Sequence, residues 1–109
     1  MSYYNADDLK KFPEISEFSP DLGAKFFEYY GAVFQEGALT AREKSLIALG
    51  AAHAVQCSYC IDAYTVDNLK RGVTPEQMME AVHVAAAIRG GASLVHSVQM
   101  MNKVKKLSM

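Results

Sequence analysis

TAREKSLIALGAAHAVQCSYCIDAY, residues 40–64, is the stretch that decides how this chain folds and which chemistry it can support. It begins with Thr40-Ala41-Arg42-Glu43, a capping box that opens a helix. Apolar residues then recur at helical spacing. The stretch also contains Cys57-Ser58-Tyr59-Cys60, which holds the only two cysteines of the 109 residues.

The number of residues between Thr40 and Gly72 predicts two helices rather than one. Gly50 is the only glycine between these two ends, and there is no proline. A single helix of about 30 residues would be about 45 Å long, which exceeds the width of a compact domain of this size. We therefore expect a break near Val55-Gln56, with Cys57 beginning a new helix.

Capping signals outside this stretch predict further helices. Ser19-Pro20-Asp21 reads as the start of a helix that ends near Gly37, and Thr74-Pro75-Glu76-Gln77 reads as the start of another. Gly90-Gly91 predicts a break or bend before a last helix, from Ala92 to about Lys106. No segment alternates between apolar and polar residues as a strand would. The fold class is therefore all-α, a bundle of about five to six helices.

The chain length fits about one domain. We expect residues 1–18 to form an arm or short helix that packs through Leu9, Phe12 and Ile15, and residues 19–109 to form the helical domain. The segment from Ala81 to Met101 is apolar all round and rich in small residues. One small domain cannot easily cover that surface, so a homo-oligomer is expected, with tight intramolecular packing as the alternative.

Charge and hydropathy exclude several classes of protein. The net charge is −1, with no basic stripe to neutralise phosphates, which argues against binding of nucleic acid. The longest apolar runs are far below the roughly 20 residues that cross a membrane. No signal peptide is visible, so a cytoplasmic location is expected, where a lasting structural disulfide is uncommon. No cofactor motif is present.

The cysteine pair predicts redox chemistry. Cysteines at i and i+3 face the same side of a helix and can join in a disulfide with little backbone movement. A helix start favours the thiolate of the first cysteine. One thiolate can attack a peroxide or a disulfide, and the second thiol then resolves the product. Two other roles remain open for this pair: the cysteines could be half of a zinc site, or two ordinary buried residues. No second CxxC and no HxxxH pair completes a zinc site.

Residues 40–64, continued through Gly72-Val73-Thr74-Pro75-Glu76-Gln77 to about His96, resemble the carboxymuconolactone decarboxylase superfamily. Within it they are most similar to AhpD-type alkylhydroperoxidases, and the whole chain resembles short peroxidase-like proteins associated with arsenosugar biosynthesis. The resemblance implies an all-helical trimer or hexamer. It also implies a dithiol peroxidase that is reduced by a lipoyl-bearing partner. By this resemblance, Cys60 attacks the peroxide and Cys57 resolves the intermediate.

The family's proton relay is not conserved in this chain. Ser45 stands where the AhpD pattern has a glutamate, Tyr64 where it has a histidine, and Tyr59 where a further histidine is sometimes found. Serine and tyrosine can pass hydrogen bonds, but neither is a good base at neutral pH. Tyr64 is expected to donate a hydrogen bond into the site.

Three histidines could replace the missing base. His53 lies four residues before Cys57 and is the preferred base, because a continuous helix would place the two on one face. A structural role for His53 is the alternative. His83 and His96 could approach from neighbouring helices or subunits, although a structural role is favoured for each. Glu43 is assigned to the capping box, and Asp62 and Asp67 are expected to be solvated.

The leading hypothesis is a dithiol peroxidase or thiol–disulfide oxidoreductase that reduces hydroperoxides with a thiol or lipoyl-type reductant. Its candidate catalytic residues are Cys57, Cys60, His53 and Tyr64, without a metal. The alternative is a protein that binds a soft metal or metalloid, such as arsenic, through the same two thiolates. Lactone decarboxylation is a third possibility, which the CxxC argues against because that reaction needs no dithiol.

Overall fold

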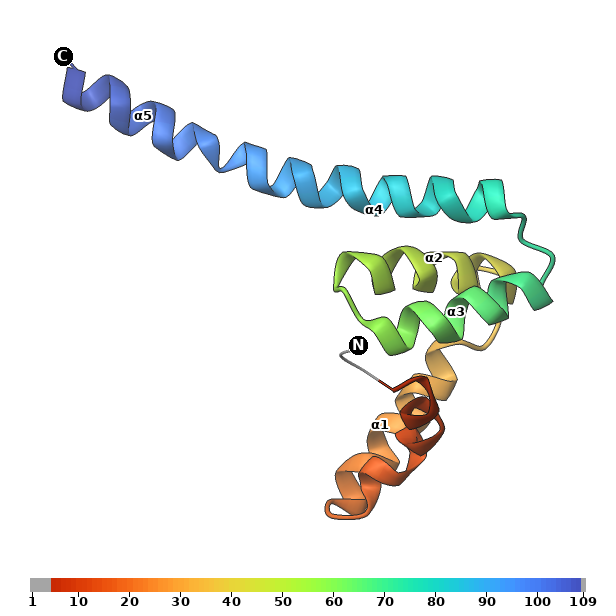
Figure 1. Cartoon of the computed structure of the whole chain (residues 1–109). Helices are drawn as coiled ribbons and strands as arrows, with labels where there is room; N and C mark the ends of the chain where they lie inside the picture. Colours follow the sequence, from red (N-terminus) through yellow and green to blue (C-terminus); the bar gives the residue numbers. More distant parts are fainter. Residues whose placement is uncertain (1–4, 109) are drawn as a thin grey trace.

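The computed structural model describes residues 5–108, and within them it shows one 3₁₀-helix and five α-helices without a strand (Figure 1). The all-α prediction is therefore confirmed. In chain order the elements are η1 (Ala6–Ser16), α1 (Pro20–Val33), α2 (Ala41–Ala54), α3 (Ser58–Lys70), α4 (Pro75–Val95) and α5 (Ser97–Ser108).

Both predicted capping boxes are present. At the start of α2, Thr40 N–H donates to the Glu43 carboxylate at 2.8 Å, and Glu43 N–H donates to Thr40 Oγ1 at 3.1 Å. Thr74 and Gln77 make the same reciprocal pair at the start of α4. The backbone hydrogen bond from Thr40 holds the pKa of Glu43 below its ordinary value. Glu43 is thus part of the cap, as expected.

The predicted break between α2 and α3 occurs at Gln56. This residue has a φ of 57°, in the left-handed region that side chains other than glycine seldom adopt. Cys57 follows in an extended conformation, with its N–H donating to Ala52 O at 3.0 Å, and caps α3. The break folds α3 back along α2.

The predicted break at Gly90-Gly91 is wrong. Helix α4 continues through both glycines to Val95, and the change of direction comes at His96 (Figure 1). A glycine inside a helix costs only about 1 kcal/mol relative to alanine and keeps its backbone hydrogen bond. Neither glycine adopts a positive φ. Two glycines therefore weaken this helix without ending it.

Helices α2, α3 and α4 form the body of the molecule, with α2 packed against both of the others. Element η1 packs against α1 and α3, and α4 continues with α5 as a long arm away from the body (Figure 1). The radius of gyration is 18.8 Å, whereas a compact chain of this length has about 13 Å. The buried apolar residues all lie in the body or its connections: Leu49, Ala52, Val73 and Ala85.

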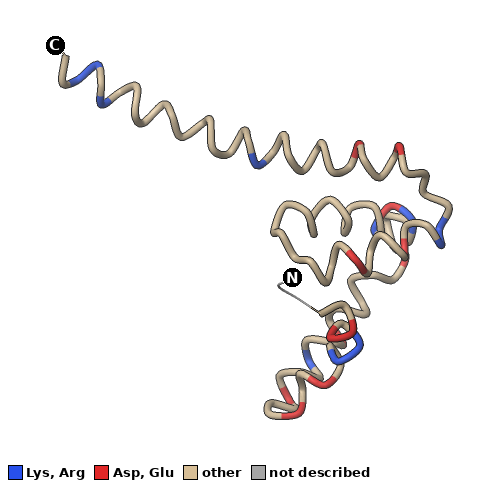
Figure 2. Tube along the Cα trace, in the orientation of Figure 1, with Lys and Arg blue, Asp and Glu red and all other residues tan. Residues whose placement is uncertain are grey.

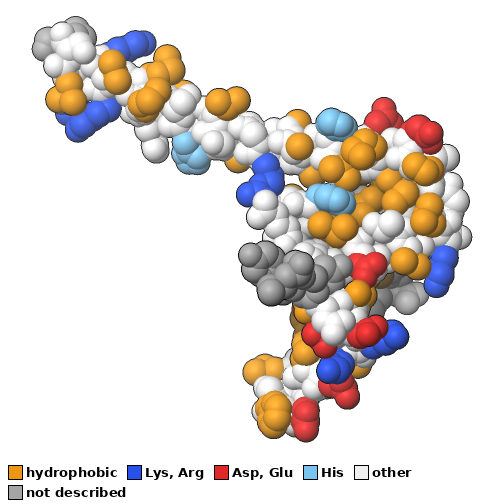
Figure 3. All heavy atoms as spheres, viewed as in Figure 1, with side chains coloured by type: hydrophobic (Ala, Val, Ile, Leu, Met, Phe, Trp, Pro, Cys, Tyr) orange, Lys and Arg blue, Asp and Glu red, His pale blue; other side chains and the backbone are white. Residues whose placement is uncertain are grey.

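Much apolar surface is therefore exposed in the single chain. Hydrophobic side chains gather where α4 lies over α2, and they continue along α5 (Figure 3). On α4 and α5 they include Ile88, Leu94, Val98, Met101 and Val104. Lysine and arginine are distributed along the described chain, from η1 to α5 (Figure 2). Among residues 5–108, no helix combines the length and apolar character needed to cross a bilayer.

Candidate active site

The two cysteines occupy the first turn of α3. Cys57 is the N-cap residue, and its Sγ accepts a hydrogen bond from the backbone N–H of Cys60 at 3.2 Å. The first N–H groups of a helix have no partner within the helix, so a side chain that accepts from them stabilises the start. Here a sulfur has the role that serine or aspartate usually plays. Both cysteines are half-buried free thiols.

The surroundings of Cys60 raise the pKa of its thiol. Burial, the hydrogen bond with Cys57 and negative charge on Cys57 together raise the pKa of Cys60 from 9.0 to about 11. Cys60 therefore keeps its proton at neutral pH. Within residues 5–108, no hydrogen bond joins either sulfur to an imidazole or a carboxylate.

A cleft of about 520 Å³ lies in front of the two cysteines, and we call it the dithiol cleft. Helix α3 contributes Cys57, Tyr59, Cys60 and Tyr64, and α1 contributes Phe27 and Tyr30. The remaining wall comes from η1 and includes Leu9, Phe12 and Ile15. The volume lies in the range of small-molecule sites, and the lining is mainly apolar.

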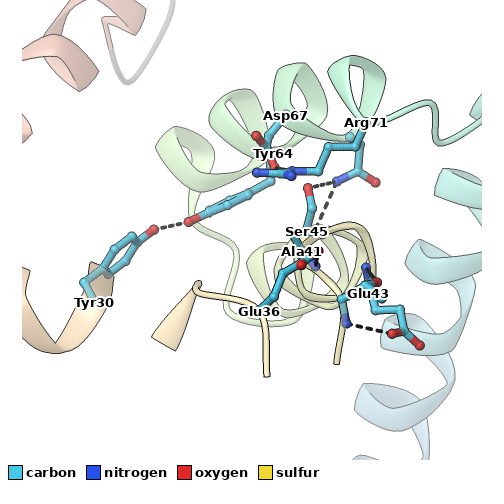
Figure 4. Close-up of polar contacts among 10 residues, drawn as sticks. Tyr30, Glu36, Ala41, Glu43, Ser45, Tyr64, Asp67 and Arg71 are labelled. Atoms are coloured by element: carbon cyan, nitrogen blue, oxygen red, sulfur yellow. Dashed lines mark hydrogen bonds and ion pairs between the residues drawn. The ribbon is translucent and has the colours of Figure 1, made fainter. Parts of the chain in front are cut away.

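Tyr64 reaches the dithiol cleft and hydrogen-bonds through its hydroxyl to the hydroxyl of Tyr30 (Figure 4). The ring of Phe34 stacks on Tyr64, with centroids 5.3 Å apart. Burial first, and then the bond to Tyr30, raise the pKa of Tyr64 well above its ordinary value. Its hydroxyl therefore stays protonated and can donate a proton in a hydrogen bond, but it does not act as a base.

Tyr30 is a site residue that sequence reasoning missed. Its spacing with Phe26, Phe27 and Phe34 assigns it to the apolar face of α1. The available signal was the hydroxyl group itself, because a tyrosine in a row of phenylalanines needs a polar partner when it is buried.

His53 does not line the dithiol cleft. Its Nδ1 lies 2.9 Å from Leu49 O, and because a carbonyl oxygen only accepts, Nδ1 carries the proton. The side chain instead lines a separate hollow between α2 and α4, together with Val82 and Arg89. The preference for His53 as the base assumed a continuous helix, and the left-handed Gln56 removes the four-residue relation to Cys57.

The other two histidines are also separate from the dithiol cleft of the single chain. His83 is exposed on α4, and His96 is exposed at the junction of α4 and α5. Neither lines the dithiol cleft. Asp62, which was expected to be solvated, is half-buried in α3.

Ser45 belongs to a buried polar cluster between α2 and α3. Asn68, which is 0 % exposed, donates through Nδ2 to Ser45 Oγ at 2.8 Å and to Ser45 O at 3.0 Å. Within the described chain, Asn68 Oδ1 has no partner. At the position of the AhpD glutamate, this chain therefore has a serine that ties two helices together.

Asp67 is not simply solvated, as the sequence suggested. Its carboxylate accepts from Arg71 Nε at 2.9 Å and from the Ser45 side chain. Burial raises the pKa of Asp67, but these hydrogen bonds and the charges of Arg71 and Lys70 outweigh it and lower the pKa overall. Figure 4 shows Tyr64, Asp67 and Arg71 along one helix, with Ser45 on the next.

Residues 5–108 contain no group of three or more histidine, cysteine, aspartate or glutamate side chains that could hold a metal ion. Among the cysteine, histidine, aspartate and glutamate side chains of these residues, only the two cysteine sulfurs could bind a soft ion at this site. The arrangement does suit a reversible dithiol, because both sulfurs lie in one helical turn and face one accessible cleft.

Comparison with known proteins gives relatives along most of the chain. An uncharacterised protein encoded in the cox locus of Paracoccus denitrificans is 39% identical over 84 residues, which span 77% of this chain and 76% of that protein. A crystal structure of a protein from Methanobacterium thermoautotrophicum superimposes with a TM-score of 0.75 at 34% identity. The match covers 79% of this chain and 97% of the archaeal one.

The family model for carboxymuconolactone decarboxylases matches residues 20–103. That range includes both cysteines and all of α1, α2, α3 and α4, but not η1. The more specific resemblance to the arsenosugar-associated group stays a prediction. With its helical fold and this match, the chain belongs to the carboxymuconolactone decarboxylase family.

Proposed function

We propose that this protein is an AhpD-like dithiol peroxidase, a thiol–disulfide oxidoreductase that reduces hydroperoxides through Cys57 and Cys60. The observation that supports it best is that both sulfurs lie in the first turn of α3 and line the same cleft. Two ordinary core cysteines would have no reason to share an open cleft with a pair of tyrosine hydroxyls.

The reaction has two chemical steps and a reset. A cysteine thiolate attacks the terminal oxygen of a hydroperoxide ROOH, so that an S–O bond forms, the O–O bond breaks and RO⁻ takes a proton to leave as ROH. The second thiol attacks the resulting sulfenic acid, and water leaves as the disulfide forms. A dithiol reductant of the lipoyl type then returns two electrons and two protons to the pair.

We assign the first attack to Cys57, the reverse of the order that the AhpD resemblance implies. Cys60, with its pKa of about 11, is a poor source of thiolate at neutral pH. At the position of the glutamate that serves as the AhpD base, this chain has the buried Ser45. Cys57 Sγ, in contrast, accepts an N–H bond at the positive end of a helix. Cys60 then supplies the proton and sulfur of the second step.

Tyr64 and Tyr30 supply the polar end of the dithiol cleft. Two bonded hydroxyls have two protons between them, so one remains free to hydrogen-bond to the leaving oxygen. Such donors stabilise charge that develops in a transition state. His53 stays outside this proposal for the single chain, because it lies in a different hollow.

We also propose a homo-oligomer, a trimer or hexamer, working in the cytoplasm. Its support is the exposed apolar surface of α4 and α5, including Leu94 at 72% and Val95 at 63% exposure, which exceeds what single soluble chains usually leave uncovered. The two free thiols fit a reducing compartment. Light scattering coupled to size exclusion would measure the mass, and a monomer at micromolar concentration would contradict the oligomer.

The test of the peroxidase is stopped-flow consumption of a hydroperoxide with dihydrolipoamide as reductant. Cys57→Ser and Cys60→Ser should each abolish turnover, and Ser58→Ala, an exposed neighbour in the same turn, should retain it. Equal turnover in the protein and in Cys60→Ser would refute the dithiol mechanism.

The same variants test the order of attack. After one equivalent of peroxide, dimedone should label Cys57 in the Cys60→Ser variant. Cys60 in the Cys57→Ser variant should react more slowly, because burial still raises the pKa of its thiol after the contribution of Cys57 is gone. The opposite pattern would restore the family order.

A second candidate, binding of a soft metalloid, is favoured by the lack of any base bonded to the two sulfurs within the described residues. Two adjacent thiolates can bind trivalent arsenic without proton transfer from a neighbour. Titration with arsenite while free thiols are counted would show a loss of two thiols per chain. If the thiols remain free, this function is excluded.

A further inference from the structure

We infer that η1 is the specificity element of the dithiol cleft and that Phe12 selects neutral hydroperoxides with a bulky apolar group, such as an aryl-substituted alkyl group. The choice of a hydroperoxide rests on the proposed peroxidase function. The choice of an apolar, uncharged ligand rests on the dithiol cleft alone.

The wall that η1 forms is not part of the family match. The match begins at residue 20, whereas η1 ends at Ser16. Helices α1 and α3, which carry the cysteines and both tyrosines, lie inside the match. The reactive part of the dithiol cleft therefore lies inside the family match, and the third wall lies outside it.

Phe12 joins the wall that η1 forms to the part of the cleft inside the family match. Its ring centroid lies 5.0 Å from that of Phe27 and 6.2 Å from that of Tyr30, with steep interplanar angles of 72° and 83°. Edge-to-face contacts of this kind favour aromatic packing. All three rings line the dithiol cleft, so an aromatic or branched apolar group could extend the same packing.

The charges at the cleft compensate one another. Asp8 and Lys11, both lining residues from η1, form an ion pair at 3.4 Å. The pair leaves little net charge to attract a carboxylate or a phosphate. An uncharged organic hydroperoxide therefore fits the lining better than an anionic one.

Hydrogen peroxide would gain little from this wall, because it has no apolar group to bury. An apolar pocket discriminates between ligands that differ by a hydrocarbon group by about 10- to 200-fold. The ratio of the rate for an apolar hydroperoxide to the rate for hydrogen peroxide should therefore depend on Phe12, although Phe12 takes no part in bond making or proton transfer.

The kinetic test compares kcat/KM for cumene hydroperoxide with that for hydrogen peroxide. Phe12→Ala should lower the cumene value about tenfold more than the hydrogen peroxide value. Phe18→Ala is the matched control, because Phe18 follows η1, is 93% exposed and does not line the dithiol cleft. An equal change for both peroxides, or none, would overturn the inference.

A binding test separates this inference from the proposed function. The Cys57→Ser/Cys60→Ser double variant is titrated by calorimetry with 2-phenyl-2-propanol, an unreactive alcohol with the same apolar group. Binding should weaken about tenfold with Phe12→Ala and persist with Phe18→Ala. Phe12-dependent binding without peroxidase activity would refute the proposed function alone. Absent or Phe12-independent binding would refute the role of η1.

Loss of fold is checked with Phe12→Leu, which keeps an apolar side chain but removes the ring. If Phe12→Ala unfolds at a lower temperature than the parent protein, Phe12→Leu takes its place in the kinetic test and in the binding test. A smaller loss of cumene hydroperoxide turnover and of alcohol binding is then expected.

Discussion

Tyr30 and Tyr64 donate and accept a hydrogen bond between their hydroxyls, and this bond joins α1 to α3 at the dithiol cleft (Figure 4). The two residues lie 34 positions apart in the chain. Their pairing places two phenolic side chains in the wall of the cleft that the two cysteines also line. It also fixes the distance between the helix that carries the cysteines and the helix that supports η1.

Removing either hydroxyl should slow the reaction. Tyr64→Phe and Tyr30→Phe should each lower the rate of peroxide consumption about 10- to 150-fold, since a hydrogen bond to a developing charge contributes about 1.5–3 kcal/mol. Stopped-flow kinetics measures this, with Tyr29→Phe as control, because Tyr29 is 68% exposed and does not line the cleft. If Tyr64→Phe reacts as fast as the parent protein, the hydroxyl pair is structural.

The raised pKa of Cys60 makes stability depend on alkaline pH. Below about pH 9 both folded and unfolded chains hold the proton, so the contribution of Cys60 is fully present. Between its ordinary value of 9.0 and about 11, the unfolded chain releases the proton first, and the free energy of unfolding therefore falls. Because Cys60 is only half-buried, solvent screening should keep the effect small.

This pH effect is measured by urea unfolding of the reduced protein and of Cys60→Ser across the alkaline range. The two proteins differ only at position 60, so the difference isolates Cys60 and its coupling to Cys57. If the free energy of unfolding of the parent protein rose with pH relative to that of Cys60→Ser, the prediction would be contradicted. The ultraviolet absorbance of the thiolate follows the same titration directly.

Asn68 should matter for stability rather than for chemistry. Asn68→Ala removes two hydrogen bonds to Ser45 from a fully buried site, at a cost of about 1–3 kcal/mol. Thermal and chemical unfolding measure it, and Asn102→Ala, exposed on α5, is the control. Equal stability of the two variants would mean that water replaces Asn68 at no cost.

Gly23 controls how closely η1 approaches α1. A methyl group added at Gly23 would overlap the Ser16 side chain and lie 2.8 Å from its Cα, so Gly23→Ala must displace the end of η1. Gly31→Ala is the matched control on the same helix, because nothing lies within 4 Å of its added carbon. Gly23→Ala should reduce the preference for cumene hydroperoxide, whereas Gly31→Ala should retain it and stabilise α1 by up to about 1 kcal/mol. Equal selectivity in both variants would contradict the proposed role of η1.

The sequence by itself determined the helices, both capping boxes, the break before Cys57 and the cysteine pair at one helix start. Each of these depends on residues within about four positions of one another, where backbone hydrogen bonds and side-chain size set the outcome. Element boundaries were less well predicted: the first α-helix ends at Val33 rather than near Gly37, and the last begins at Ser97 rather than Ala92. The break at Gly90-Gly91 was wrong because a helix can tolerate the low helix propensity of two glycines.

Only the tertiary structure decided what meets the sulfurs. It separated His53 from Cys57 through the left-handed Gln56, paired Tyr64 with Tyr30, and enclosed Ser45 with Asn68. It also brought η1 to the dithiol cleft. Apart from the separation of His53 from Cys57, these relations join residues far apart in the chain. They depend on how helices cross and pack, which the spacing of residues along one helix does not encode.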